Sequence, residues 1–144
     1  MESRLSLVLR NQLSELKRMS ETVSAWCGGN NFSSAVEFQV NLALDEIISN
    51  IIRYGWKDHG EHQFNVRLSL FDDEVTVEVE DDATPFNPLE VPVPDLTQPL
   101  DERPVGGLGI HLVRQVMDGL EYQRVNGKNL LVMKKKVSYA QGHQ

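Results

Sequence analysis

Apolar residues alternate with polar ones in several short stretches of the chain, and this period of two predicts β-strands. The stretches assigned to strands cover residues 4–9, 64–70, 75–79, 120–125 and 129–137. Asp72-Asp73 separates the second stretch from the third, and Asn126-Gly127 separates the fourth from the fifth. Because such dipeptides favour tight turns, we expect a β-hairpin at each of these two places.

Three other stretches repeat their apolar residues every three or four positions, which predicts helices over about residues 12–27, 34–54 and 106–120. In the longest, the apolar residues share one broad face: Val36, Val40, Leu44, Ile47, Ile48 and Ile51. Ser33 or Ser34 should cap this helix, with Glu37 completing a capping box, and Gly55 should end it.

This order of elements predicts an α+β fold, a two-layer α/β sandwich in which helices cover one face of a mixed, mostly antiparallel sheet. With 144 residues, we expect one domain spanning residues 1–144. Residues 82–105 lack periodicity and contain all six prolines, so this segment is interpreted as a lid loop. The tail from residue 138 onward is expected to fray.

Charge and cysteine content exclude several function classes. The formal net charge is −7, and the largest basic cluster is the lysine triplet 134–136, so direct binding to nucleic acid is not expected. Cys27 is the only cysteine, which excludes a disulfide framework and favours a reducing compartment. No apolar run approaches the length of a membrane span. We therefore expect a soluble, cytoplasmic protein without membrane contact.

Glu46 and Asn50 lie one helical turn apart at the edge of the apolar face of the long helix. They could simply begin the solvated face of that helix. They could also point into one cleft beside the sheet, where a phosphoryl-transfer site needs an oxygen ligand for Mg²⁺ and a base that activates the acceptor. Asn50 suits the first need and Glu46 the second.

Two further features are candidates for nucleotide binding. Gly106, Gly107 and Gly109 precede or begin a helix, where backbone amides can approach phosphate, although a plain junction between loop and helix explains them as well. Arg103 just before them could reach a phosphate or remain solvated. Asp81, at the end of a strand, could accept a hydrogen bond from a base amino group or hold a turn.

In this order, three stretches resemble the motifs of the ATP-binding domain of the GHKL superfamily, which includes gyrase and histidine kinases. DEIISNIIRYGW resembles the N box, VEDDATPFNPLE the first glycine box and VGGLGIHLVRQVMDGLEY the second. The short length, and the strand and helix before the N box, look like those of the bacterial anti-sigma-factor serine/threonine kinases.

The resemblance implies a role for each matching residue. Asn50 would coordinate Mg²⁺ on the ATP phosphates, Glu46 would be the catalytic base, and Asp81 would bind the adenine amino group. The remaining cofactor-binding positions would be Ala83, Phe86, Arg103, Gly106, Gly107, Leu108 and Gly109.

The chain departs from the family pattern at three places. Ala83 replaces a glycine two residues after Asp81, and its methyl group should weaken or reshape adenine binding. Tyr54 replaces a histidine of the N box, and Asn129-Leu130 stands where the family tends to place a threonine near the adenine.

The leading hypothesis is an ATP- and Mg²⁺-dependent kinase that phosphorylates serine or threonine on an anti-sigma-factor antagonist and regulates transcription by holding a sigma factor. The alternative is a protein-binding module gated by nucleotide through its lid, without kinase activity. Lys17 and Arg18 could contribute a partner or homodimer surface, or only a solvated basic face. The catalytic half of a two-component histidine kinase, or a domain that binds no nucleotide, is a weaker interpretation.

Overall fold

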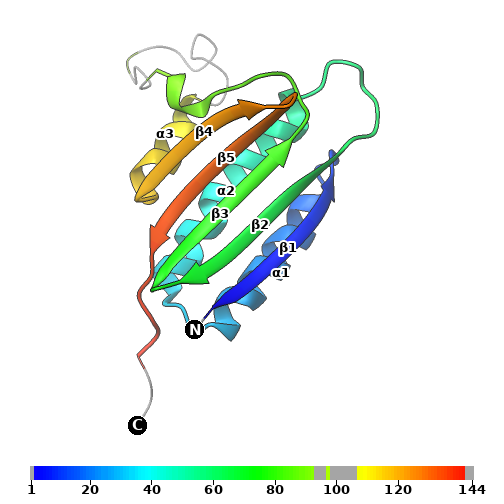
Figure 1. Ribbon diagram of the computed structural model, residues 1–144. Helices are drawn as coiled ribbons and strands as arrows, with labels where there is room; N and C mark the ends of the chain where they lie inside the picture. The colour runs from blue at the N-terminus through cyan, green and yellow to red at the C-terminus, as the bar shows by residue number, and fades with distance from the viewer. Residues whose placement is uncertain (1, 93–96, 98–106, 142–144) are drawn as a thin grey trace.

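The computed structural model describes residues 2–92, 97 and 107–141, and its strands form one sheet. The strands are β1 (Ser3–Arg10), β2 (Gln63–Phe71), β3 (Glu74–Asp81), β4 (Gly119–Val125) and β5 (Lys128–Lys136). Their order across the sheet is β1-β2-β3-β5-β4 (Figure 1). All the predicted strands are confirmed.

Every pairing between the described strands is antiparallel, so the expected mixed character of the sheet is not found there. Tight turns join β2 to β3 and β4 to β5, and two helices separate β1 from β2 along the chain. Asp72, Asp73, Asn126 and Gly127 all have positive φ angles, the conformation that two-residue hairpins require. The two predicted hairpins are therefore confirmed.

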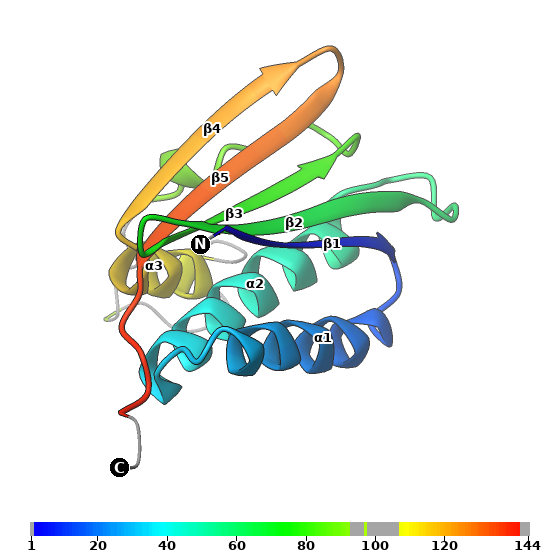
Figure 2. The ribbon, with the colours of Figure 1, turned by 60° about the horizontal axis from the view of Figure 1, so that its bottom comes forward.

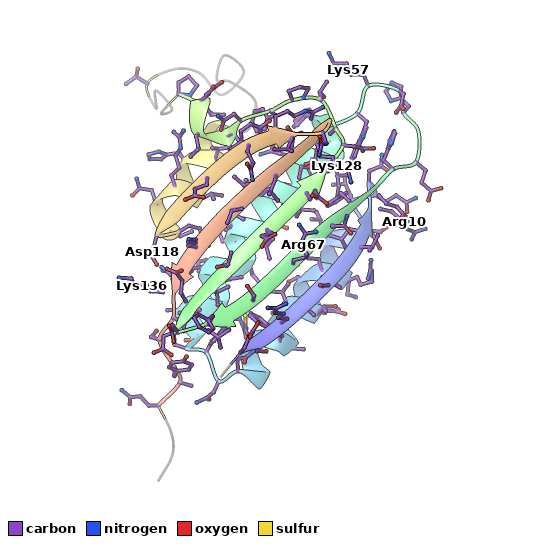
Figure 3. All side chains as sticks on the ribbon, viewed as in Figure 1. Arg10, Lys57, Arg67, Asp118, Lys128 and Lys136 are labelled. Atoms are coloured by element: carbon purple, nitrogen blue, oxygen red, sulfur yellow. The ribbon has the colours of Figure 1, made fainter. Side chains whose placement is uncertain are left out.

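One face of the sheet is covered by the helices α1 (Glu15–Gly29), α2 (Ser34–Tyr54) and α3 (Gly107–Val116) (Figure 2). Buried side chains from the helices and from the inner face of the strands form the core. The other face carries polar side chains, with Arg67 near its middle (Figure 3). Arg67 pairs there with Glu78 at 3.1 Å and Glu80 at 3.7 Å. The predicted two-layer α+β sandwich is confirmed.

Helix α1 begins at Glu15, later than the sequence pattern predicts, and leaves Leu13 outside it with 47% of its surface exposed. The Glu15 carboxylate explains this start, because it accepts hydrogen bonds from the Arg10 amide at 3.0 Å and from Arg18 at 2.7 Å. These contacts lower the pKa of Glu15 from 4.5 to about 2. Arg18 therefore pairs with Glu15 of the same helix, and it also donates a hydrogen bond to the Val8 carbonyl.

Replacing Glu15 with glutamine should lower the free energy of unfolding at pH 7 by about 1–2 kcal/mol. The loss is no larger because Arg18 is half exposed, and solvent weakens its attraction to Glu15. Since the folded pKa is depressed, the contribution of Glu15 is complete above its unfolded pKa and disappears as pH falls from about 4.5 toward 2. Urea denaturation should show the two proteins converging over that range. Glu21→Gln, on the exposed side of the same helix, is the control and should cost little at any pH.

The start of α2 and the C-terminal segment are linked. Ser33 caps α2 by accepting from the Val36 amide at 3.3 Å, but its own amide donates to the Ser138 carbonyl at 2.9 Å. The predicted capping box with Glu37 is therefore wrong, because Ser138 already satisfies the Ser33 amide. Tyr139 also donates to Asp73 at 2.6 Å, so the tail is tied to the fold at least this far and the expected fraying from residue 138 is wrong.

The proposed lid is described only in part. Residues 82–92 follow β3 and include one short 3-10 helix, Pro88–Glu90, while the remainder of the segment, except Thr97, lies outside the described residues. In the part of the chain that the structure describes, no helix has both the length and the apolar character needed to cross a membrane.

Candidate functional site

A cavity of about 430 Å³ opens between α2, α3 and the inner face of the sheet, at the end of β3. This volume lies within the usual range of small-molecule sites. Most of the lining is apolar, and a few polar groups converge on it. The lining residues are Ile47, Asn50, Ile51, Tyr54, Gly55, Lys57, Val79, Asp81, Ala83, Thr84, Pro85, Phe86, Pro88, Ile110, Tyr122, Asn129 and Leu131.

Asn50 contributes an unsatisfied amide to this cavity. Its Nδ2 is fully buried and has no hydrogen-bond partner among the described residues. Burying an amide group without a partner costs about 1–3 kcal/mol, so such a group is rarely retained without a ligand or water to satisfy it. Because the amide nitrogen and oxygen can exchange places by rotation, the same side chain can present its oxygen to a cation.

Glu46 lies one turn before Asn50 on α2 and is not among the cavity lining. Its carboxylate packs against Gly109 in α3, where a Cβ atom would lie 2.9 Å from Glu46 Cδ and nearer still to Oε2. Partial burial raises the pKa of Glu46, and the nearby Asp45 raises it further, while Arg53 opposes both effects. A raised pKa makes a carboxylate a stronger base, which suits proton abstraction.

Replacing Gly109 with alanine should displace the Glu46 carboxylate, because the added methyl group would occupy its position. If Glu46 is the catalytic base that the sequence predicts, nucleotide turnover should fall by at least about tenfold, while nucleotide affinity changes less. Gly28→Ala, a helical glycine with nothing within 4 Å of the added methyl group, is the matched control. Equal turnover in both variants, measured as ADP release, would contradict the assigned role of this contact.

Asp81 ends β3 and is 6% exposed, with its side chain at the cavity. Within the described residues, Asp81 Oδ1 accepts from the Ala83 amide at 3.0 Å and from Asn129 Nδ2 at 2.9 Å. Burial raises the pKa of Asp81, and these two hydrogen bonds and Arg124 offset part of that rise. The carboxylate therefore holds a local turn and also faces the cavity.

Ala83, where the family pattern has glycine, is 4% exposed. Its Cβ would lie only 3.0 Å from a Cβ placed on Gly55 at the end of α2. A glycine at position 55 thus leaves room for the methyl group of Ala83. The two segments are also joined by a hydrogen bond of 2.9 Å from the Thr84 amide to the Gly55 carbonyl.

Of the other predicted site residues, the structure describes some and leaves others outside the described residues. Phe86 lines the cavity and is 46% exposed, and Gly107 and Leu108 form the start of α3. Gly106 and Arg103 lie outside the described residues. The structure thus brings the N-box and first-glycine-box residues Asn50, Asp81, Ala83 and Phe86 to one cavity, with Glu46 beside it.

Lys57 and Tyr122 also line the cavity and were not predicted as site residues. Asn129, which the sequence analysis noted only as a departure from the family pattern, lines the cavity as well. Lys57 follows the C-terminal end of α2, close to the end of the sheet where β5 begins (Figure 3). The sequence pattern could have indicated Asn129, because this residue lies on the same buried side of its strand as Leu131 and Met133. A polar residue on the buried side of a strand indicates either an internal hydrogen-bond network or a ligand-binding site.

The described residues contain no group of three or more histidine, cysteine or acidic side chains that could hold a metal ion on their own. Mg²⁺ in nucleotide sites takes most of its ligands from phosphate and water, so one or two protein ligands suffice. The unsatisfied amide of Asn50 fits this requirement.

Comparison with known families agrees with this geometry. The model of the histidine kinase-like ATPase domain matches residues 9–135, which is most of the chain. The chain belongs to the histidine kinase-like ATPase domain family. The matched range includes α2, the end of β3 and the start of α3, the elements that surround the cavity.

Individual relatives in this family are named as kinases. The serine/threonine-protein kinase BtrW of Bordetella bronchiseptica is 28% identical over 104 residues, 72% of this chain and 73% of that protein. The serine-protein kinase RsbW of Listeria monocytogenes is 24% identical over 90% of this chain and 84% of its own length. The RsbW of Bacillus mycoides is 27% identical, and the match spans 61% of that protein.

Two solved structures share the fold. The RsbU and RsbW domains of a Mycobacterium tuberculosis protein superpose with a TM-score of 0.69 at 11% identity, covering 96% of this chain and 33% of that chain. The histidine kinase domain of a blue-light activated kinase from Erythrobacter litoralis gives 0.56 at 16% identity, covering 86% and 60%. The predicted resemblance to GHKL domains and anti-sigma-factor kinases is confirmed.

Proposed function

We propose that this member of the histidine kinase-like ATPase domain family is an ATP- and Mg²⁺-dependent protein kinase that phosphorylates serine or threonine on an anti-sigma-factor antagonist. The observation that carries the proposal is the unsatisfied Asn50 amide in a cavity shared with Asp81, one helical turn from Glu46. The serine/threonine kinase names of BtrW and RsbW support the choice of acceptor. As a regulator, the protein would also hold a sigma factor, in the cytoplasm.

In the proposed mechanism, the apolar cavity holds the adenine, and Asp81 accepts a hydrogen bond from its amino group. The backbone amides at the start of α3 would hold the phosphates. Asn50 would hold Mg²⁺ through its amide oxygen, and the ion would supply neutralisation of phosphate charge. Glu46 accepts the proton of the attacking hydroxyl group, and its raised pKa favours that step.

A second candidate function is that of a nucleotide-gated protein-binding module, and the hydrogen bonds of Arg114 favour it. Arg114 in α3 donates to three carbonyl groups of the segment after β3: Pro88 at 3.1 Å, Val91 at 2.9 Å, and Leu89. A nucleotide at the start of α3 could therefore influence this segment through the helix, and so alter a protein-binding surface without any transfer of phosphate.

Titration calorimetry of the protein with Mg²⁺-ATP is the first test of both candidates. We expect binding in the micromolar range that is lost when Mg²⁺ is chelated. Absence of binding with and without Mg²⁺ would contradict both candidates. If ATP binds, labelled γ-phosphate should then appear on a serine or threonine of an anti-sigma-factor antagonist only if the protein is a kinase.

A further inference from the structure

Asn129 lies at the centre of a hydrogen-bond network beside the proposed base-binding carboxylate. It is the register partner of Asp81 across the β3–β5 pair and is 6% exposed. Its Nδ2 donates to Asp81 Oδ1 at 2.9 Å and to the Thr84 carbonyl at 3.0 Å. Its Oδ1 accepts from the Tyr122 hydroxyl and from the Phe86 amide at 3.4 Å.

The orientation of this amide group is determined by backbone atoms. The Phe86 N–H can only donate, so it requires the oxygen of Asn129 on its side, and the Thr84 carbonyl can only accept, so it requires the nitrogen. An amide group has two N–H donors and an oxygen with two lone pairs, and all of these are used here. Asn129 therefore has no hydrogen-bonding capacity left for a ligand.

The network has two consequences for the cavity. It directs two N–H donors, from Asn129 and Ala83, to the same oxygen of Asp81, so the other oxygen is the one left for a ligand. It also holds the segment 84–86, whose residues line the cavity, against the start of β5. A misplaced Asn129 would disturb both the carboxylate and the wall beside it.

We propose that Asn129 is the positioning residue for base recognition. It holds Asp81 so that the free carboxylate oxygen of Asp81 accepts a hydrogen bond from the exocyclic amino group of adenine. The same oxygen disfavours a 6-oxo purine. The inference rests on the proposed function, because it assigns Asp81 to the base. A keto group at the same place would face a carboxylate oxygen with no donor between them, and such a mismatch is poorly tolerated in a buried site.

The charges around Asp81 make this role testable by pH. Arg124 on β4 donates to the Ala83 carbonyl at 2.8 Å and favours the charged carboxylate, whereas Asp82 disfavours it. Tyr122, also on β4, reaches Asp81 only through Asn129. An aspartate at position 129 would put a second carboxylate where the Nδ2 donor now lies, and two carboxylates at that distance ionise together only at high pH.

The experiment measures the affinities of Mg²⁺-ATP, Mg²⁺-ITP and Mg²⁺-tripolyphosphate by calorimetry at pH 6 and pH 8. Wild type should prefer ATP to ITP. Asn129→Asp should lose at least about tenfold in ATP affinity at pH 8 and regain part of it at pH 6, where the shared proton restores a donor. Asn129→Leu should lower the preference for ATP over ITP at both pH values, and Tyr122→Phe should lower it less.

Tripolyphosphate has no base, so its affinity should be unchanged in all three variants if they fold. A parallel loss of ATP and tripolyphosphate affinity would overturn the inference, because it would indicate a general structural role. So would an Asn129→Asp variant that binds ATP like wild type at both pH values. Asn65→Asp, placed on the uncovered face of β2, is the matched control.

The wild-type measurements separate the inference from the function on which it rests. Failure of wild type to bind either ATP or tripolyphosphate would overturn the proposed function and the inference together. Wild type that binds ATP and ITP equally well would leave the proposed function standing and overturn the inference alone.

Discussion

Replacing Asn50 with alanine should abolish measurable Mg²⁺-ATP binding, a loss of at least about 100-fold in affinity. The reason is that Asn50 is the one described cavity residue with a buried amide lacking a hydrogen-bond partner, and the described residues hold no ready metal cluster that could replace it. Calorimetry with and without a chelator measures the effect. Chelation should lower the affinity of wild type toward that of the variant, while the variant should respond little.

Asn41→Ala is the matched control for this prediction. Asn41 lies on the same helix, but its amide is satisfied by Ser24 at 3.2 Å and by the Glu37 carbonyl at 3.0 Å, away from the cavity. Its replacement should leave ATP affinity within about threefold of wild type. An Asn50→Ala variant that folds and binds Mg²⁺-ATP as tightly as the control would show that the nucleotide does not use this amide.

Glu46→Gln should lower phosphoryl transfer by about 10²- to 10⁴-fold and leave ATP affinity nearly unchanged. Glutamine keeps the shape of the side chain against Gly109 but cannot accept the proton of the acceptor hydroxyl group. The measurement is transfer of labelled γ-phosphate to an anti-sigma-factor antagonist. Glu37→Gln, near the other end of α2, should transfer phosphate like wild type.

The same carboxylate should set the acid limb of the transfer rate. Because Glu46 must be deprotonated to act as a base, the rate should fall as pH drops through its raised pKa. Asp45→Asn removes one cause of that rise, so the acid limb should move to lower pH. If ATP binds but no transfer occurs in wild type at any pH, the nucleotide-gated module is the better interpretation.

Local patterns in the sequence were sufficient to predict the helices, the strands, the two hairpins and the two layers. Alternation fixes which side of a strand is apolar, and the Asp72-Asp73 and Asn126-Gly127 turns adopt positive φ angles with little dependence on distant contacts. The helical periodicity likewise places Glu46 and Asn50 at the half-buried edge of α2. These properties depend on residues close together in the chain, so the sequence alone could predict them.

The start of α1 and the position of the tail depended on contacts outside the periodic patterns of the helices and strands. Glu15 starts α1 because the Arg10 amide at the end of β1 binds its carboxylate, and Ser138 replaces Glu37 as the partner of the Ser33 amide. The Arg10 contact spans only five residues, but it lies in the irregular connection between β1 and α1, where no periodicity predicts it. The contact between Ser33 and Ser138 joins segments that meet only after the chain has packed.

The fold class, the three motifs and the candidates Glu46, Asn50 and Asp81 could all be predicted from the sequence. The packed structure was needed to show that Asn50 and Asp81 share one cavity, that Glu46 lies beside it against Gly109, and that Asn129 donates a hydrogen bond to Asp81. Periodicity reports which side of an element is buried, whereas hydrogen-bond partners on different strands are chosen by register and packing. The residues that position the site were therefore visible only once β3, β4 and β5 were aligned.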